Sequence, residues 1–415
     1  MENRPIEIMA PVGSYESLMA AIQGGADSVY FGVEHLNMRS RSANNFSLED
    51  LQKITNIASK SGIKTYLTLN VEVFDNEMNL VHNVLDTAKA SGVSAVIAAD
   101  IAVIQYARSI NLEVHISTQV NITNIEAVKF YSNFADVIVM AREMNLGRIY
   151  EINSHINEQQ IKGPSGKLVR IEMFIHGALC MAVSGKCYLS LHEMKSSANR
   201  GSCLQTCRRA YIVSDKETGA ELEIDNEYIM SPKDLKAINF LNKILDSGVS
   251  VLKIEGRARS PEYVKTTVQC YSEAVDAYFD GTFSEEKING WNQRLSSVFN
   301  RGFWDGYYLG QRLGEWSGTY GSKAVKRKIY AGKCTNYFTK IQIAEFKLEA
   351  IDLNVGDEII IIGPTTGVEQ TIIQEIRVDL NPVKTGKKGE MVSIPIKIKL
   401  RRADKIFKII DSKAC

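Results

Sequence analysis

Four cysteines lie close together in the middle of the chain, and their type and spacing indicate chemistry. Cys180, Cys187, Cys203 and Cys207 fall within 28 positions, with the spacing C-x6-C-x15-C-x3-C. In a reducing compartment such a group is typical of a metal or redox site rather than a disulfide framework. Four thiolates suit zinc or an iron–sulfur cluster. Structural zinc usually uses C-x2–4-C pairs, and Cys180 and Cys187 are too far apart for one, which favours the iron–sulfur cluster.

Two other roles for these cysteines are a radical-SAM cluster and a catalytic nucleophile. The C-x3-C-x2-C signature of radical-SAM enzymes is absent, because Arg208 and Arg209 follow Cys207 and no third cysteine is close. A nucleophile formed by Cys180 with His176 stays open, although it leaves the other three cysteines unexplained. The lone cysteines are expected only to pack, and they are Cys270, Cys334 and Cys415.

Strand-like and helix-like segments alternate over the first 280 residues or so. These segments must position the clustered cysteines. Apolar, often β-branched runs are each followed by an amphipathic segment, which is typical of a parallel sheet covered on both faces. Eight such units predict an α/β fold, namely a TIM-like barrel with a cysteine-rich insertion between strands seven and eight. A doubly wound open sheet stays open, although no G-x-G-x-x-G follows the first strand. The runs begin at Ile6, Ser28, Ile63, Ser94, Leu112, Asp136, Ile171 and Ser250.

The chain is expected to contain two domains. Residues 1–320 form the predicted barrel, with the insertion at about 178–248, and residues 324–415 change to short strands and turns. That change predicts a small all-β barrel, a common binding accessory. The stretch from Lys384 to Lys408 is basic, which is typical either of a solvated, protected sheet edge or of an RNA contact.

Polar side chains collect at the carboxyl ends of the predicted barrel strands, where TIM barrels carry their sites. For any single one of these residues, the alternative to a functional role is a structural one, in a network of salt bridges that stabilises the barrel mouth. The cations indicate a small anionic substrate, because Arg forks match carboxylates. The predicted substrate-binding residues are Arg39, Arg41, Gln119, Arg142, Lys253 and Arg257. The predicted catalytic residues are Glu172, His176 and Glu255, and the remaining polar residues at these ends are Asn70, Asp100, Asn121 and Glu143.

The composition of the 415 residues is that of an ordinary globular protein, with 45% hydrophobic and 23% charged residues. Lys and Arg number 49 against 48 Asp and Glu, so the formal net charge of +1 gives no general affinity for phosphate backbones. Contact with nucleic acid would therefore need a local patch. No run approaches ~18 apolar residues, and the start has no secretory h-region. We expect a cytoplasmic protein without a membrane partner.

The segment EMFIHGALCMAVSGKCYLS, from Glu172 to Ser190, resembles the signature of the collagenase-like peptidase family of unassigned catalytic class. The pattern is Glu-x-Phe, two residues, Gly-Ala-Leu-Cys, four residues and Gly-x-Cys-x-Leu-Ser. The resemblance extends over nearly the whole chain. Further matching blocks are IMAPVGSYESLMAAIQGGADSVYFG, HISTQVNITN, VMARE, VLKIEGRARSPEYV and NRGFWDGYYLG. The length and the C-terminal β module look most similar to the branch that hydroxylates tRNA (tRNA hydroxylation protein P).

The resemblance implies oxygen-independent hydroxylation with a 4Fe–4S cluster and with prephenate as co-substrate. The tRNA branch forms 5-hydroxyuridine at the anticodon wobble position. Cys180, Cys187 and Cys203 match the family's cluster cysteines, and Cys207 is the natural fourth ligand, a position that differs among branches. Prephenate is a dicarboxylate, in agreement with the cationic strand ends.

The implied partner is a tRNA anticodon loop, with a second family subunit left open. Arg208, Arg209 and the basic C-terminal module are expected to hold tRNA phosphates. Three other functions stay open: a peptidase, although H-E-x-x-H and G-x-S-x-G are absent; a hydroxylase of rRNA or a quinone; and a non-catalytic RNA-binding factor. Zinc remains the alternative metal at the four cysteines.

Overall fold

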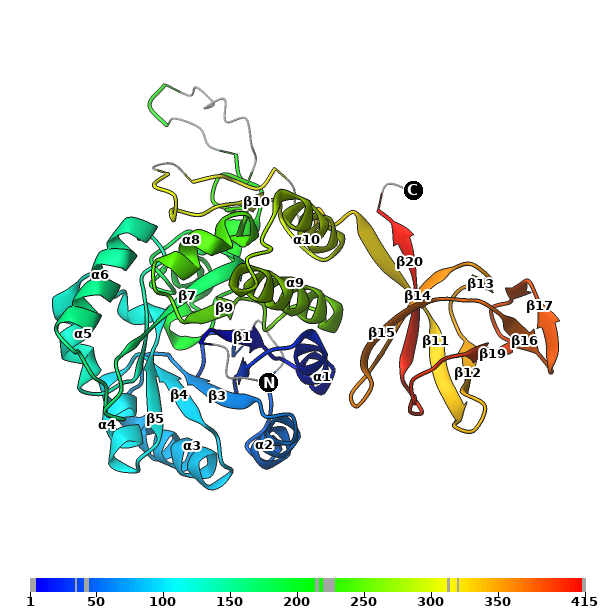
Figure 1. Ribbon diagram of the computed structural model, residues 1–415, viewed down its shortest axis with the longest axis horizontal. Coiled ribbons are helices and arrows are strands. Elements are labelled where there is room, and N and C mark those ends of the chain that lie inside the picture. The colour runs from blue at the N-terminus through cyan, green and yellow to red at the C-terminus, as the bar shows by residue number, and fades with distance from the viewer. Residues whose placement is uncertain are drawn as a thin grey trace.

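Eight parallel strands form a closed barrel in the computed structural model, which describes residues 5–33, 36–40, 45–212, 216–218, 228–311, 314–318 and 321–412 (Figure 1). The last strand pairs in parallel with both the first and the seventh, so the sheet has no free edge. This confirms the predicted TIM-like barrel and excludes the doubly wound sheet. The strands are β1 (Glu7–Pro11), β2 (Ser28–Phe31), β3 (Lys64–Leu69), β4 (Ala95–Ala98), β5 (Glu113–Ile116), β6 (Val137–Val139), β7 (Arg170–Gly177) and β9 (Val251–Ile254).

Helices cover the outside of the barrel, and local sequence signals set their ends. At the first helix, the Ser14 hydroxyl accepts from the Ser17 amide at 3.2 Å, and Gly25 ends the helix with a φ of 84°, which glycine adopts without steric cost. None of the described helices combines the length and apolar composition needed to cross a membrane. The covering helices are α1 (Tyr15–Gly24), α2 (Asp50–Lys60), α3 (Met78–Ala90), α4 (Ile101–Ser109), α5 (Ile125–Ser132), α6 (Leu146–Glu158), α8 (Leu241–Asp246) and α9 (Pro261–Phe279).

The cysteine-bearing segment lies between β7 and β9 and has little regular structure. It contains α7 (Leu189–Met194), short 3-10 turns and the strand β8 (Asp234–Lys236). Strand β8 runs antiparallel to the end of β7, and β10 (Phe303–Trp304) pairs with β8 in turn. Residues that follow the barrel, including α10 (Glu285–Ser297), therefore return to the same side of β7 as the cysteines.

The C-terminal residues are all β, as predicted, but their hydrogen bonds form an open sheet. Eight strands lie in the order β15-β14-β20-β11-β12-β19-β16-β17, and β13 pairs with β18 separately. The end strands β15 and β17 do not pair with each other, so the expected closed barrel is not what the ladders form. Strand patterns in a sequence do not tell whether two end strands meet. The bounds are β11 (Lys326–Phe338), β12 (Ile343–Leu348), β13 (Leu353–Asn354), β14 (Glu358–Gly363), β15 (Gly367–Ile372), β16 (Ile376–Val378), β17 (Asn381–Val383), β18 (Thr385–Gly386), β19 (Met391–Pro395) and β20 (Lys405–Asp411).

The C-terminal sheet packs against helices α1 and α9 on the outside of the barrel (Figure 1). The Gln23 side chain donates to the Thr366 carbonyl and accepts from the Val368 amide, both at 2.9 Å. Lys265 of α9 donates to the Val368 carbonyl at 2.7 Å. Because Val368 also belongs to the apolar core of the barrel, the two parts share buried surface as well as hydrogen bonds.

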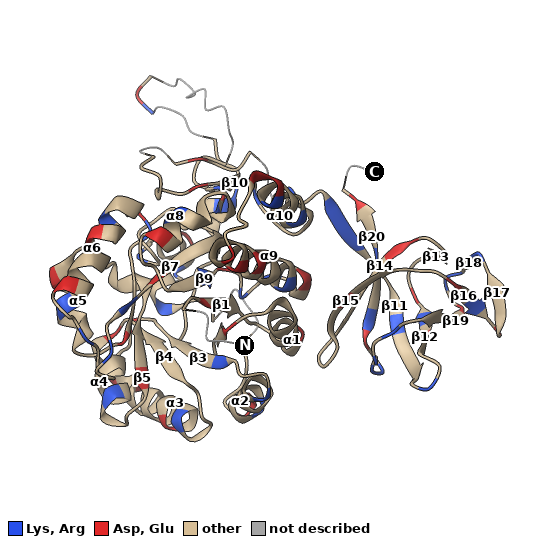
Figure 2. Ribbon diagram, viewed as in Figure 1, with Lys and Arg blue, Asp and Glu red and all other residues tan. Residues whose placement is uncertain are grey.

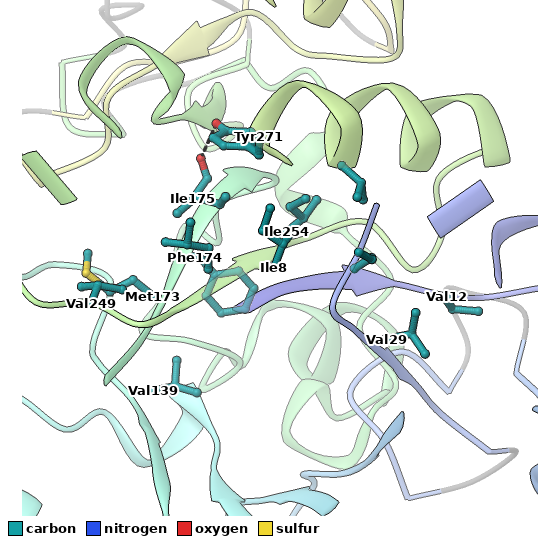
Figure 3. Close-up of a cluster of buried hydrophobic side chains, with 14 of the residues drawn as sticks. Ile8, Val12, Val29, Val139, Met173, Phe174, Ile175, Val249, Ile254 and Tyr271 are labelled. Carbon is teal, nitrogen blue, oxygen red and sulfur yellow. Dashed lines mark hydrogen bonds between the residues drawn. The ribbon is translucent and has the colours of Figure 1, made fainter. Parts of the chain in front are cut away.

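The main apolar core lies between the barrel and its helices. Figure 3 shows Ile8 of β1, Ile175 of β7 and Ile254 of β9 below helix α9. Tyr271 of α9 is fully buried and donates to the Ile175 carbonyl at 2.9 Å, so the longest helix is tied to the barrel by a polar bond as well as by packing.

A buried carboxylate network closes the amino-terminal end of the barrel. Glu7 accepts from Tyr66 at 2.6 Å, from Arg170 at 2.8 Å and from Lys64 at 3.1 Å. Burial alone would raise the pKa of Glu7, but the charges of Arg170 and Lys64 and the Tyr66 bond lower it from 4.5 to about 2. The folded state therefore holds the ionised carboxylate more strongly than the unfolded chain does.

We predict that Glu7→Gln lowers the free energy of unfolding by about 3 kcal/mol at pH 7. The folded pKa lies below the unfolded one, so this stabilisation is present above pH 4.5 and is lost as the pH falls toward 2. Urea unfolding at several pH values should show the difference from the unmodified protein shrinking below pH 4.5. Glu126→Gln, which removes an exposed ion pair with Lys129, is the control and should change little. A difference independent of pH would contradict the assignment.

Candidate functional site

A cavity of about 160 Å³ opens at the carboxyl end of the barrel, where the predicted functional residues converge. One water needs on the order of 10–15 Å³, so the space is large enough for a small molecule. All four clustered cysteines and most of the predicted substrate-binding residues line it. These residues are Cys180, Cys187, Cys203, Cys207, Arg39, Gln119, Arg142, Lys253, Glu255 and Arg257.

Lys253 reaches the cavity from β9 and is held by a carboxylate below it. Its Nζ lies 2.7 Å from Glu172 Oε1, and both side chains are buried. The ammonium also lies 4.7 Å from the centre of the Tyr30 ring. Burial lowers the pKa of Lys253 even though Glu172 raises it. Glu172 does not line the cavity, and its Oε2 has no hydrogen-bond partner among the described residues, so it positions Lys253 rather than meeting a substrate.

Glu255 faces the cavity as a carboxylate. Its Oε1 accepts from Arg39 Nη2 at 3.1 Å. Burial alone would raise the pKa of Glu255, but the charges of Arg39, Arg259 and Arg142 lower it below its usual value. Glu255 is therefore ionised at neutral pH, and it can accept a proton or a hydrogen bond but cannot act as an acid there.

Two further arginines have no carboxylate within 4.0 Å in the described part of the chain. Arg257 Nη1 donates to Thr68 Oγ1 at 2.7 Å, and burial lowers the pKa of Arg257 to about 10, so it stays charged at neutral pH. Arg142 donates to the Ala178 carbonyl at 3.0 Å and lies 3.9 Å from the Phe174 ring centre. Arg257 is buried and Arg142 is partly buried, and a bound anion would supply the counter-charge that both lack.

Glycine makes room for this arrangement at one strand end. A Cβ on Gly32, just after β2, would lie 2.5 Å from Arg257 Nη1 and 2.7 Å from Asn37 side-chain atoms. Any larger residue would displace the guanidinium from the cavity wall.

Several predicted residues lie elsewhere. His176 does not line the cavity: its Nδ1 lies 3.3 Å from Tyr271 Oη, and burial, followed by the charges of Lys236 and Arg259, lowers its pKa to about 3. A histidine so placed packs inside the protein and is a poor base at neutral pH. Asp100 is the cap of α4, accepting from the Ala102 amide at 2.8 Å. Arg41 lies outside the described residues.

The four clustered cysteines are free thiols around one space. Burial raises the pKa of Cys207 to about 11, with Arg208 lowering it and Cys180 among the groups that raise it. Within the described residues no three His, Cys, Asp or Glu side chains are grouped closely enough to hold one metal ion. All four cysteines line the same cavity, and four thiolates are the ligand set that a 4Fe–4S cluster uses.

Arg208 has a structural contact rather than the expected phosphate contact. Its guanidinium donates to Ser231 Oγ at 3.0 Å, to the Pro232 carbonyl at 2.6 Å and to the Leu179 carbonyl at 2.7 Å. These bonds fasten the end of the cysteine segment to its beginning. Arg209 is more exposed and lies 3.5 Å from Glu193.

The basic stretch of the C-terminal sheet is largely exposed. Lys387 pairs with Asp352 at 3.0 Å and Lys408 with Asp357 at 2.8 Å. Figure 2 shows Lys and Arg on β11 and around β16 and β18, whereas the barrel helices carry charges of both signs. The exposed cations in this stretch are Lys384, Lys387, Lys388, Lys397, Lys399, Arg401, Arg402 and Lys405.

Sequence reasoning missed the aromatic lining of the site. Tyr30 and Phe174 face the first cavity from inside strands, where they read as ordinary core residues. Trp304, Tyr307 and Trp316 line an adjacent cavity and follow the barrel in the chain. For Trp304 and Tyr307 the only signal was the aromatic density of the segment NRGFWDGYYLG, and Trp316 lies outside that segment.

Comparison with known proteins places this architecture in a family. Residues 13–318, which hold every cysteine of the cavity and all the barrel strands except β1, match peptidase family U32. The chain belongs to the U32 family. The match confirms the resemblance read from the Glu172–Ser190 segment.

Relatives within the U32 family carry different names. A protein of Porphyromonas gingivalis named collagenase is 58% identical over 98% of this chain and 99% of its own length. A Bacillus subtilis protein named tRNA hydroxylation protein P1 is 33% identical over 86% of this chain and 83% of its own. An Escherichia coli 23S rRNA 5-hydroxycytidine C2501 synthase is 33% identical over 66% of this chain and 40% of its own. Family membership is therefore shared by proteins named for two kinds of reaction.

We predict that Glu172→Gln lowers the free energy of unfolding by about 3–5 kcal/mol, because it leaves the Lys253 ammonium buried without a counter-charge. The double change Glu172→Gln with Lys253→Met removes that charge and should recover part of the loss. Urea unfolding at pH 7 measures both. A double variant no more stable than Glu172→Gln would show that the ion pair is not what Glu172 provides.

Proposed function

We propose that this chain is an RNA-modifying enzyme that hydroxylates tRNA without oxygen, using prephenate, to form 5-hydroxyuridine at the anticodon wobble position. One observation carries the proposal: four free cysteines and a set of buried cations line the same cavity at the mouth of the barrel. The Bacillus subtilis relative named for tRNA hydroxylation supports an RNA substrate. The Escherichia coli relative supports the same chemistry and makes rRNA the alternative target.

The cations would bind the dicarboxylate. Arg257 and Arg142 have no carboxylate partner among the described residues, and Lys253 lies near them on the cavity wall. Glu172 keeps Lys253 in place from below, while the rings of Tyr30 and Phe174 exclude water around its Nζ. Glu255 would repel a carboxylate, so it orients the anion toward the arginines or accepts a proton during the reaction.

Cys180, Cys187, Cys203 and Cys207 would hold the 4Fe–4S cluster. The donor set fits, because four free thiols face one space and soft thiolates are the ligands such clusters use. When bound, the cluster would supply redox or Lewis-acid chemistry beside the anion. Zinc at the same thiols is the alternative metal.

The target nucleotide must be unstacked to reach this cavity, and an anticodon loop is already single-stranded. The exposed cations between Lys384 and Lys405 would hold RNA phosphates, which position a nucleic acid without reading its sequence.

A peptidase is the second candidate, because the Porphyromonas gingivalis relative is named collagenase. Among the described residues that line the cavity there is no histidine, and His176 is bonded to Tyr271. A cysteine nucleophile with a histidine base therefore finds no support in the geometry. If the purified protein cleaves gelatin, and the Cys187→Ala variant cleaves it as well, the peptidase would be favoured.

We predict that a strain lacking this gene has lost 5-hydroxyuridine and its derivatives from tRNA, as measured by mass spectrometry of nucleosides beside the parent strain. Complementation with Cys187→Ala should not restore the nucleoside, and the purified variant should lack the brown chromophore of a cluster. Cys270→Ala, which changes a buried cysteine of α9, is the control and should retain both. Unchanged tRNA with altered rRNA would move the target to rRNA, and restoration by Cys187→Ala would refute a cluster-dependent reaction.

We predict that Arg257→Met raises the prephenate concentration needed for half-maximal modification by about 10- to 150-fold, the effect of losing a charge-assisted hydrogen bond. The cluster chromophore should remain. Lys129→Met, an exposed cation on α5, is the matched control. An unchanged prephenate dependence in Arg257→Met would show that the anion binds elsewhere.

A further inference from the structure

A second cavity, of about 200 Å³, lies beside the first and is walled by aromatic rings. Trp304 and Tyr307 meet edge to face with ring centres 5.2 Å apart. Trp316 is 36% exposed, so part of its ring is open to solvent. The loop around Cys180 lies between the cavities, since Leu179, Cys180, Met181, Ala182 and Ser184 line both of them.

We infer that this second cavity receives the uracil base of the RNA substrate. The inference rests on the proposed function and specifies where its base is bound. Enzymes that act on a base hold it against aromatic side chains after removing it from the stack, and each such contact contributes substantially to binding. The cavity offers three aromatic rings in a protein that has only three tryptophans, two of them here.

Polar residues in the wall suit a pyrimidine base. Trp304 is 5% exposed, and its Nε1–H has no partner among the described residues; the same holds for Arg142 Nε. Glu143 adds a carboxylate to the lining. The pairing edges of uracil and cytosine each carry two acceptors and one donor, so these residues suit either pyrimidine, and the choice of uracil follows from the proposed function.

The position of the cavity suits the proposed reaction. Arg142 and Cys180 line both cavities, so a base in the second and a small anion in the first would be separated only by the Leu179–Ser184 loop. The base would then lie beside the proposed cluster ligand without displacing the anion.

Gly314 allows the cavity to be filled by mutation. A Cβ at this position would lie 3.5 Å from Tyr307 Oη and 3.8 Å from atoms of the Trp304 and Trp316 rings, which are ordinary contacts. Its φ lies outside the left-handed region, so a larger side chain can project among the rings without backbone strain. Gly290 of α10 has no neighbouring atoms within 4 Å of such a Cβ and is the matched control.

Tryptophan fluorescence tests the inference without any assay of activity. In a Trp291→Phe background, both remaining tryptophans line the cavity, because Trp291 lies on α10 and donates to Glu273. We expect a single-stranded oligouridylate to quench the fluorescence to saturation and ribose 5-phosphate not to quench it. Gly314→Leu should abolish the saturable quenching and Gly290→Leu should retain it.

Variants that replace Trp304 or Trp316 lose one of the two fluorescent side chains. Their affinity for a labelled oligouridylate is therefore measured by fluorescence anisotropy of the label. Trp316→Ala should weaken binding by roughly 5- to 150-fold through loss of stacking. Trp304→Phe keeps a ring but removes the donor, and should weaken binding by about three- to tenfold. The Trp316 backbone pairs with Pro232, so the local chain path does not depend on its side chain.

The outcomes separate this inference from the proposed function. Unchanged oligouridylate binding in Gly314→Leu would overturn the base site. Hydroxylated tRNA made normally by Gly314→Leu would also overturn it while leaving the proposed function intact. A third outcome is possible: Gly314→Leu abolishes the saturable quenching, but deletion of the gene leaves the tRNA and rRNA nucleosides unchanged. That result would support the base site and overturn the proposed function.

Discussion

The closure of the barrel by β9 is the constraint on which the site depends. This strand forms parallel ladders with β1 and β7 at once, which places Lys253 beside both Met9 and Phe174. Only a closed sheet brings residues from the second, sixth and eighth strands around one mouth. In an open sheet Arg39 and Arg257 would lie far apart, and neither the Glu255 contact nor a common anion site would exist.

Closure also concentrates charge where charge is costly to bury. Two of the four cations at the mouth have partners, Lys253 with Glu172 and Arg39 with Glu255. Arg142 and Arg257 have no carboxylate partner among the described residues, and Arg257 is buried. A buried charge without a counter-charge destabilises a fold, so its persistence at one end of a barrel whose other end holds the ion pairs of Glu7 is typical of a site prepared for a ligand.

The cysteine segment and the residues after the barrel complete the site from above. Arg208 ties the two ends of the segment together, and β10 pairs with β8 so that Trp304 lies next to the Cys180 loop. The described part of the segment contains little regular structure, so its position depends on such side-chain contacts, which also include the ion pair of Arg200 with Glu77. The C-terminal sheet, in contrast, is fixed to the outside of α1 and α9 by bonds to Gln23 and Lys265.

The sequence by itself determined the alternation of strands and helices, the barrel, the all-β C-terminal part and the cysteine cluster, because these depend on local periodicity and on residue types close together in the chain. It also indicated the strand-end cations, since parallel strands present their carboxyl ends together. Only the tertiary structure decided that His176 and Asp100 are used for packing and capping, that Glu172 supports Lys253, and that Arg208 holds the segment. The same holds for the aromatic cavity of Trp304, Tyr307 and Trp316. Except for the cap at Asp100, which is a local contact with Ala102, these depend on contacts between parts of the chain far apart in sequence or on which side of a closed sheet a side chain points, and no local pattern carries that information.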